Sequence, residues 1–385
     1  MKATSIRSSA IHSSSDRTIA MPCASDDQAR EGENDSVPPP QGYWRLAWRS
    51  RYGANSLLFE QRAVVVNLGL LVTLLLACML YLSLGSVKVA PGAVLQALLG
   101  NAGMMANFVV QELRLPRLAA ACFTGAAFAL AGILMQTLAR NRLATPGIIG
   151  IDNGATAFAV ASIVGVGFSI APPAMALAGA TTAAVLTFGL AAGSGTQGYR
   201  FIVAGIGVGA VFGAITQLLL ARVAIDTANA AYPWTVGSLN ARPIGALQLL
   251  MLGLGLGLAT ALALARSLTL LRFKDATASG LGVNVKRRRR EVLLLSVALT
   301  ALAVAVAGPV GMVGLIGPEI ARSLSSSRSV PILAATLSGA LVMVLADLAG
   351  RTLLAPIEIP VGIVTAVVGG PWLLWILMRP QRSFT

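Results

Sequence analysis

Long apolar segments without any charged residue dominate this sequence and limit what it can fold into. A helix needs about 20 apolar residues to cross the hydrocarbon core of a bilayer. Only 11% of the chain is charged, against about 25% in ordinary soluble domains. Inside lipid, backbone polar groups must be bonded internally, which leaves helices or closed barrels. Barrel strands alternate in polarity, whereas these segments are continuous runs of Leu, Ala, Val and Gly. The sequence therefore predicts an all-α integral membrane protein.

We interpret eight of the charge-free windows as membrane-spanning. They are Ala63–Val87, Leu118–Ala139, Asn153–Tyr199, Phe201–Ala221, Pro243–Ala265, Val292–Pro318, Ser329–Ala346 and Ile359–Met378. The third is too long for one helix, and Ala171-Pro172-Pro173 divides it into two, because proline breaks a helix interior. This count gives nine spans.

The basic residues indicate that nine is one too few. Nine spans place the two ends of the chain on opposite sides, yet both flanks are basic, which favours the cytoplasm for both ends. Gly308-Pro309 interrupts the window that ends at Pro318, so we expect a span over 291–308 and a return helix over 310–325. Ten spans then leave fifteen Lys and Arg in the inner loops and six in the outer loops, which is the bias of the positive-inside rule.

Residues 1–60 differ from the rest of the chain. They are rich in Ser, Asp, Glu and Arg and include Pro38-Pro39-Pro40, a composition that cannot bury enough apolar surface to fold. We expect a disordered, polar cytoplasmic tail over 1–60 and a transmembrane domain over 61–380. No short apolar core follows the first charges, so the segment does not resemble a signal peptide. Whether Met1 or Met21 is the first residue stays open.

Several kinds of chemistry lack their residues here. The single histidine is His12, and Cys23, Cys78 and Cys122 do not have the spacing of a metal site or a disulfide framework. No glycine-rich stretch is followed by Lys-Ser or Lys-Thr, so no P-loop is predicted. The basic residues behind the net charge of +14 lie between apolar runs, where they orient helices and do not indicate nucleic-acid binding. We expect no cofactor, no metal and no catalysis.

Charged residues at the ends of the spans are candidates for function, because ionisable groups in a membrane are costly. Asp347 precedes Arg351 by four residues, and this spacing predicts a helical ion pair. Glu319 is placed to cap a short helix, and a proton-relay role, for which the sequence shows no partner, is the alternative. Arg114, Arg117 and Arg351 fall in outer loops. They form either a solvated rim or a docking ring for an acidic partner, since Arg binds carboxylates through paired hydrogen bonds.

The segment from Ser267 to Glu291 is the most distinctive soluble feature. Asp275 is placed to cap a short helix that Gly280 or Gly282 ends. Four arginines, Arg287–Arg290, follow at the expected level of anionic lipid headgroups. A bare loop needs no capped helix, so the segment predicts contact with a partner protein.

Five motifs follow one another between residues 64 and 380. They are Arg114-Leu115-Pro116-Arg117; Gly132 to Gln136 with Asn141, Leu143-Ala144, Pro146-Gly147 and Gly150; Trp234 with Gly237-Ser238-Leu239-Asn240; Gly308-Pro309 to Gly314-Leu315 with Pro318 to Arg322; and Ala346-Asp347 to Arg351 with Glu358 to Gly362. Each motif is weak alone, but five in order are specific. In these motifs the chain resembles the FecCD-type permeases, the membrane subunits of bacterial ABC importers for iron–siderophores, haem and vitamin B12.

The resemblance implies a BtuC-like permease fold of about ten spans in the bacterial cytoplasmic (inner) membrane, with both termini in the cytoplasm. It implies two ATP-binding cassette ATPase subunits, a periplasmic or lipid-anchored substrate-binding protein, and a second permease subunit, either a copy or a paralogue, all assembled in membrane lipid. The implied residue roles are docking of the binding protein by Arg114, Arg117 and Arg351; ATPase coupling by Asp275, Gly280 and Gly282; and translocation or gating by Gln136, Asn141, Pro146, Gly147 and Glu319.

The resemblance leads to the hypothesis of a permease subunit for a ferric siderophore, with cobalamin or haem as the alternative cargo. An ion-coupled secondary transporter is a further alternative, but it predicts ion-binding carboxylates within the spans. Arg142, Met312 and Glu319 stand where the family usually has Pro, Phe and His, so the motifs leave the cargo open.

Overall fold

The computed structural model describes residues 41–50, 53–85, 87–165, 170–191, 199–240, 243–326 and 328–378. The chain separates into two compact units, Met1–Gln61 and Arg62–Thr385. Each unit is described by itself.

The first unit contains a β-hairpin. Strand β1 (Tyr43–Ser50) pairs antiparallel with β2 (Gly53–Glu60), from Tyr43 opposite Glu60 to Ser50 opposite Gly53. The expectation of a disordered tail was therefore wrong for this part, while residues 1–40 lie outside the described residues. The sequence of β1 alternates large apolar residues, Trp44, Leu46 and Trp48, with other types. This period of two is typical of a strand, but composition alone does not register it.

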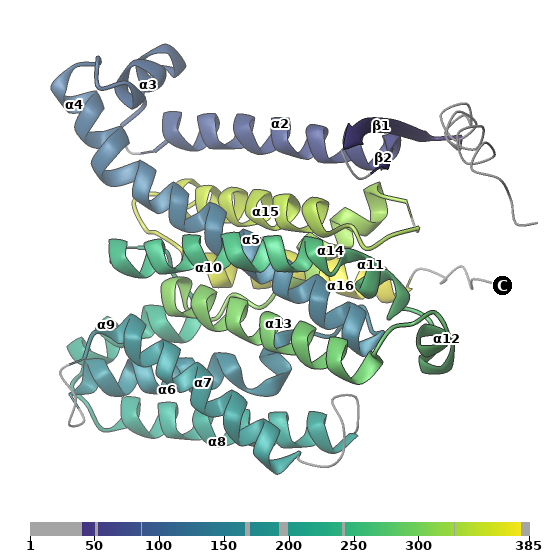
Figure 1. The fold of residues 1–385 in the computed structure, drawn as a ribbon. Coiled ribbons are helices and arrows are strands. Elements are labelled where there is room, and N and C mark those ends of the chain that lie inside the picture. Colours follow the sequence, from purple (N-terminus) through teal and green to yellow (C-terminus); the bar gives the residue numbers. More distant parts are fainter. Residues whose placement is uncertain are drawn as a thin grey trace, which may run out of the picture. The chain divides into compact units, whose positions relative to one another are not determined.

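The second unit is helical. Its long helices are α2 (Gln61–Ser83), α5 (Leu115–Ala139), α6 (Ile151–Val164), α7 (Pro172–Leu190), α8 (Tyr199–Ala221), α10 (Ile244–Ala263), α13 (Val285–Ala307), α14 (Val313–Leu324), α15 (Ile332–Thr352) and α16 (Val361–Met378). Short elements connect them: α3 (Pro91–Leu98), α4 (Met104–Asn107), the π-helix η1 (Phe108–Arg114), the 3-10 turn η2 (Pro146–Ile149), α9 (Ile225–Val236), α11 (Ala265–Leu270) and α12 (Asp275–Gly280). The long helices run in similar directions (Figure 1).

Every one of the ten predicted spans overlaps one of these helices, and the predicted return helix corresponds to the 12-residue α14. Among the described residues, seven helices are long and apolar enough to cross a membrane, and α6 and α16 are shorter apolar helices. The predicted break at Ala171-Pro172-Pro173 is confirmed, because α7 begins at Pro172. The predicted break at Gly308 is also confirmed: α13 ends there, Gly308 has a φ of 73°, and α14 starts at Val313.

Two boundaries differ from prediction. Helix α13 begins at Val285, with Asn284 accepting a hydrogen bond from the Arg287 backbone, so the run Arg287–Arg290 lies in its first turns and not in a loop. Lys and Arg are good helix formers, and absence of charge locates a span without locating the end of its helix. Glu319 lies inside α14 and does not cap it.

Helix α5 is the centre of the second unit. It is buried along most of its length and packs against α10, α13, α14 and α15. The backbones approach closely where glycines meet: a Cβ added to Gly132 would lie 2.0 Å from the Gly314 carbonyl oxygen. Small residues allow such contacts between helices in lipid. Helices α6, α7 and α8 pack together as a second group (Figure 1).

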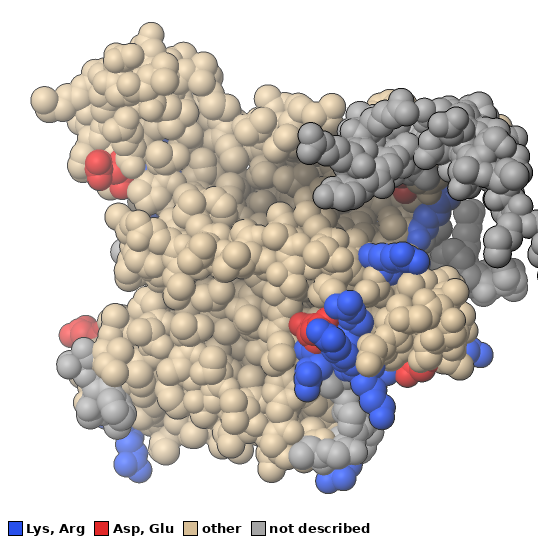
Figure 2. All heavy atoms as spheres, in the orientation of Figure 1, with Lys and Arg blue, Asp and Glu red and all other residues tan. Residues whose placement is uncertain are grey.

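Charged side chains are concentrated at the ends of the helices. Figure 2 shows most of the visible Lys and Arg side chains near α12, while the middle of this face carries uncharged residues. Large apolar side chains of α2 are exposed instead of buried, including Val65, Leu68 and Leu76. An uncharged band between charged ends is the surface expected of a membrane-spanning protein.

Candidate functional site

Asp347 is the centre of a buried polar cluster at one end of the helices. This side chain of α15 is 1% exposed and accepts hydrogen bonds from the Tyr81 hydroxyl at 2.6 Å and from two nitrogens of Arg117 at 3.0 Å each. The third nitrogen of Arg117 donates to the exposed carboxylate of Glu358 at 2.8 Å. One arginine of α5 therefore connects α15 with the segment that precedes α16.

The predicted ion pair between Asp347 and Arg351 was wrong. The Arg351 guanidinium instead lies 4.6 Å from the centre of the Tyr81 ring and donates to the Leu84 carbonyl at 3.2 Å. Arg117 can meet Asp347 with two parallel hydrogen bonds, a geometry that is stronger than a single pair along a helix. The sequence showed the four-residue spacing but not the approach of a residue from another helix.

Arg114 is buried, at 4% exposure, and donates to the carbonyl oxygens of Leu82 and Val87. Gly85 makes this possible: a Cβ there would lie 2.7 Å from the Arg114 guanidinium and 2.9 Å from that of Arg351. Arg114, Arg117 and Arg351 line one cavity of about 930 Å³ together with Lys88 and Glu358. The structure thus brings the three predicted docking arginines together, although two of them bond to the backbone that follows α2.

Asp275 is the centre of a second ionic cluster, at the other end of the helices. Arg289 of α13 donates to both carboxylate oxygens, at 2.6 and 2.8 Å, and Arg140 donates to one of them at 2.6 Å. These two arginines lower the pKa of Asp275, with Arg289 the larger cause. Asp275 occupies the first turn of α12 but does not cap it; the N-cap position is Lys274. The predicted short helix is present, and its Asp joins α12 to α5 and α13.

The two glycines predicted beside Asp275 lie at the end of α12. Gly280 is its last residue, and Gly282 follows with a φ of 83°, a left-handed conformation that favours glycine. Neither position has a neighbour within 4 Å of an added Cβ. The end of α12 is therefore open on the side where these glycines lie.

Gln136 connects α5 with α14. Its side chain is buried, donates to the Gly314 carbonyl at 3.1 Å, and accepts from Arg322 at 2.6 Å. Arg322 also bonds to Glu319 at 3.0 Å, and Arg142 reaches Glu319 at 3.6 Å. Glu319 is therefore held between two arginines, one on its own helix and one on the loop after α5.

The other predicted pathway residues shape that loop. The Asn141 side chain accepts from the Leu143 backbone at 2.9 Å, and Pro146 begins η2. An added Cβ at Gly147 would lie 2.6 Å from a carboxylate oxygen of Asp152. Asp152 was not singled out from the sequence, yet its other oxygen is buried without a hydrogen-bond partner in the part of the chain that is described. Its place next to an apolar window was the signal that could have found it.

The comparisons with known proteins agree with this architecture. The sequence model of the FecCD transport family matches residues 73–379. This chain belongs to the FecCD transport family. The chain is 36% identical over 329 residues to the Fe(3+)-citrate import system permease protein YfmE of Bacillus subtilis, covering 84% of this chain and 98% of that protein. It is 35% identical over 335 residues to the ferric enterobactin transport system permease protein FepG of Escherichia coli, covering 85% and 100%.

A solved structure shares the fold of this FecCD member. It is described as an inward-facing conformation of a metal-chelate type ABC transporter, and the match has a TM-score of 0.71 at 26% identity, covering 83% of this chain and 100% of that one. The predicted family and the BtuC-like, all-α membrane fold are confirmed. The residue roles implied by the resemblance stay predictions, which the geometry above makes specific.

Proposed function

We propose that this chain is the non-catalytic permease subunit of an ATP-driven importer for a ferric siderophore. The observation that carries the proposal is the similarity over more than four fifths of the chain to permeases whose names specify ferric citrate and ferric enterobactin. Cobalamin or haem, carried by a chain of the same architecture, is the alternative cargo.

The two charged ends support a division of labour between partners. The end with α12 and Asp275 is the proposed cytoplasmic end, where two ATP-binding cassette subunits dock on α12 and the open surface at Gly280 and Gly282. Because Asp275 bonds to Arg140 and Arg289, movement of α12 is transmitted to α5 and α13. A second permease subunit, identical or related, completes the translocation pathway.

The opposite end is the proposed docking surface for a periplasmic or lipid-anchored binding protein. Arg117 and Arg351 line its cavity, and Glu358 is exposed beside them. Arg114 is buried, so its proposed role is to hold the segment after α2 in place. Electrostatic docking weakens at high ionic strength, so association of the binding protein should fall as salt rises.

Gln136, Asn141, Pro146, Gly147 and Glu319 are the proposed gating residues. They lie at the end of α5, on the loop after it and on α14. Arg322 joins α14 to α5 through Gln136, and Arg142 joins the loop to α14 through Glu319. A rearrangement driven by the ATPase at α12 reaches this loop through Arg140, the C-cap residue that follows α5.

Uptake measurements test the proposal. Deletion of the gene should abolish uptake of one labelled ferric siderophore, and the wild-type gene should restore it. Replacing the partner ATPase with a variant that cannot hydrolyse ATP should also abolish uptake. Loss of the proton gradient in the presence of a protonophore should not by itself stop transport through the permease. If the deletion left uptake of every ferric chelate unchanged but abolished uptake of cobalamin or haem, the cargo would be cobalamin or haem instead of a siderophore.

A further inference from the structure

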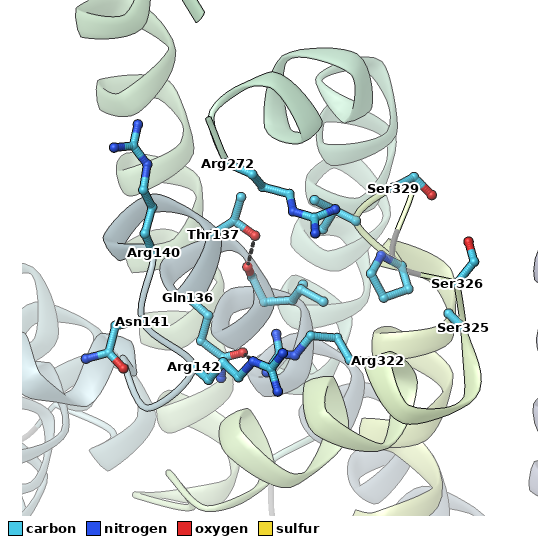
Figure 3. Close-up of a pocket in the computed structure, with 13 residues that line it drawn as sticks. Gln136, Thr137, Arg140, Asn141, Arg142, Arg272, Arg322, Ser325, Ser326 and Ser329 are labelled. Carbon is cyan, nitrogen blue, oxygen red and sulfur yellow. Dashed lines mark hydrogen bonds between the residues drawn. The ribbon is translucent and has the colours of Figure 1, made fainter. Parts of the chain in front are cut away.

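A cavity of about 370 Å³ lies at the α12 end of the helices. The end of α5, the loop after it, Arg272 between α11 and α12, and the connection from α14 to α15 enclose it (Figure 3). Its walls carry four arginines, Arg140, Arg142, Arg272 and Arg322, and three serines, Ser325, Ser326 and Ser329. No acidic residue is among the thirteen described residues that line it.

The arginines give the cavity a positive field that nearby carboxylates offset only in part. Asp275 pairs with Arg140, and Glu319, which lies outside the lining, is shared by Arg142 and Arg322. Arg140 shares Asp275 with Arg289, and Arg142 shares Glu319 with Arg322, so each of these two carboxylates is divided between two guanidinium groups. In Figure 3 the side chains of Arg272 and Arg322 extend toward the cavity, whereas Arg140 and Asn141 extend away from it. Hydroxyl groups beside arginines are suitable donors to the oxygens of a phosphate.

The cavity is also partly apolar and adjoins a lipid-facing helix. Ile133, Val330 and Pro331 contribute apolar lining. Arg62, in the first turn of α2, donates to the Leu324 carbonyl at 3.0 Å, just before the serines of the lining. Only 11% of the apolar window of α2 is buried inside the protein. The cavity is thus next to the helix that is most exposed to the surroundings among the seven long apolar helices.

We propose that this cavity binds the phosphate headgroup of an anionic phospholipid. A free phosphate ion would use the arginines but not the apolar lining, whereas a phospholipid uses both. The cavity lies where α5 and α14 end and α15 begins, which is the level of the headgroups in a spanning bundle. Basic pockets between transmembrane helices recognise anionic headgroups. The inference rests on the membrane-spanning fold and not on the cargo.

Lipid binding to the purified protein tests the inference. The wild-type protein, exchanged into detergent, is titrated with phosphatidylglycerol or phosphatidylcholine, and the bound lipid is counted by native mass spectrometry. The double variant Arg142→Gln, Arg272→Gln should bind phosphatidylglycerol about 25-fold more weakly, because each Arg near an anionic lipid is worth roughly fivefold. Ser329→Phe, which fills the cavity without changing charge, should also weaken binding.

Arg266→Gln is the matched control. It removes one arginine of α11 at the same end, but Arg266 is exposed and does not line the cavity. It should bind phosphatidylglycerol like the wild type. Equal affinity for the two lipids, or equal loss in the control and the double variant, would overturn the proposal. Competition by inorganic phosphate at the concentration where phosphatidylglycerol binds would assign the cavity to the free ion and contradict the lipid.

Discussion

At the residue scale, the buried ion pair of Arg117 and Asp347 is the contact that we expect to contribute most to the stability of the fold. Asp347→Asn removes the charge opposite a guanidinium that is largely buried, and breaking a buried pair from one side costs about 3–5 kcal/mol. We expect a marked fall in the thermal unfolding temperature of the purified protein. Glu358→Gln is the control, because Glu358 is 48% exposed and exposed pairs contribute up to about 1 kcal/mol. Equal shifts in the two variants would show that burial does not set the strength of the cluster.

Asp275 gives a prediction about pH. The bound Arg289 and Arg140 hold the pKa of its carboxyl below the ordinary value of 3.8. A lowered folded-state pKa adds stability above the pKa of the unfolded chain, and this stability is lost as pH falls. We therefore expect Asp275→Asn to unfold at a lower temperature than the wild type at neutral pH, and the difference to shrink below about pH 4. A difference that stays constant across this range would contradict the assigned cause.

Sequence reasoning at this scale found the charged residues but not their partners. Arg117, Asp347 and Asp275 were identified from type and position. Their partners lie far along the chain: Arg117 and Asp347 are 230 residues apart. Tyr81 lies in an apolar run, where nothing distinguishes it from its neighbours. Contacts of this kind depend on how helices pack, which local spacing does not encode.

At the scale of elements, the glycine contact between α5 and α14 is the sharpest test of packing. Gly132→Ala would place a methyl group 2.0 Å from the Gly314 carbonyl, and a backbone atom cannot yield as a flexible side chain does. The helices must separate, at a cost of about 1–3 kcal/mol. Gly207→Ala is the control, because nothing lies within 4 Å of its added Cβ. Unfolding temperatures should fall for the first variant only, and a similar fall in both would argue against this contact.

The helices were predictable because lipid imposes a simple rule: a span must be long and free of charge. The breaks at Pro172 and Gly308 were predictable for a related reason, because proline and glycine disturb a helix at known positions. The start of α13 was not predictable from the absence of charge, because its first turns are basic. These turns belong to the helix although they lie outside the apolar window. The hairpin over 43–60 was missed because the composition of a segment does not show whether apolar and other residues alternate along it.

At the scale of the whole molecule, the asymmetry of its two ends predicts its orientation. The end with α12 gathers Arg140, Arg142, Arg272 and the basic first turns of α13. At the opposite end, the cavity lining combines Lys88, Arg114, Arg117 and Arg351 with Glu112 and Glu358. Basic residues are retained on the cytoplasmic side. The predicted even number of spans would bring both flanks to that side, which is also the side where an ATPase obtains ATP.

Single cysteines can measure this orientation. In a background with Cys23, Cys78 and Cys122 replaced by serine, Lys274→Cys places a thiol at the exposed start of α12, and Leu353→Cys places one at an exposed position (71%) at the Asp347 end. A membrane-impermeant maleimide added to cells without an outer membrane barrier should label Leu353→Cys at once. Lys274→Cys should react only after the cytoplasmic membrane is opened, because its end of the bundle is proposed to face the cytoplasm. Labelling in the reverse order would invert the orientation and exchange the proposed sites of the ATPase and the binding protein, whereas immediate labelling of both would contradict a bundle that separates its two charged ends by a bilayer.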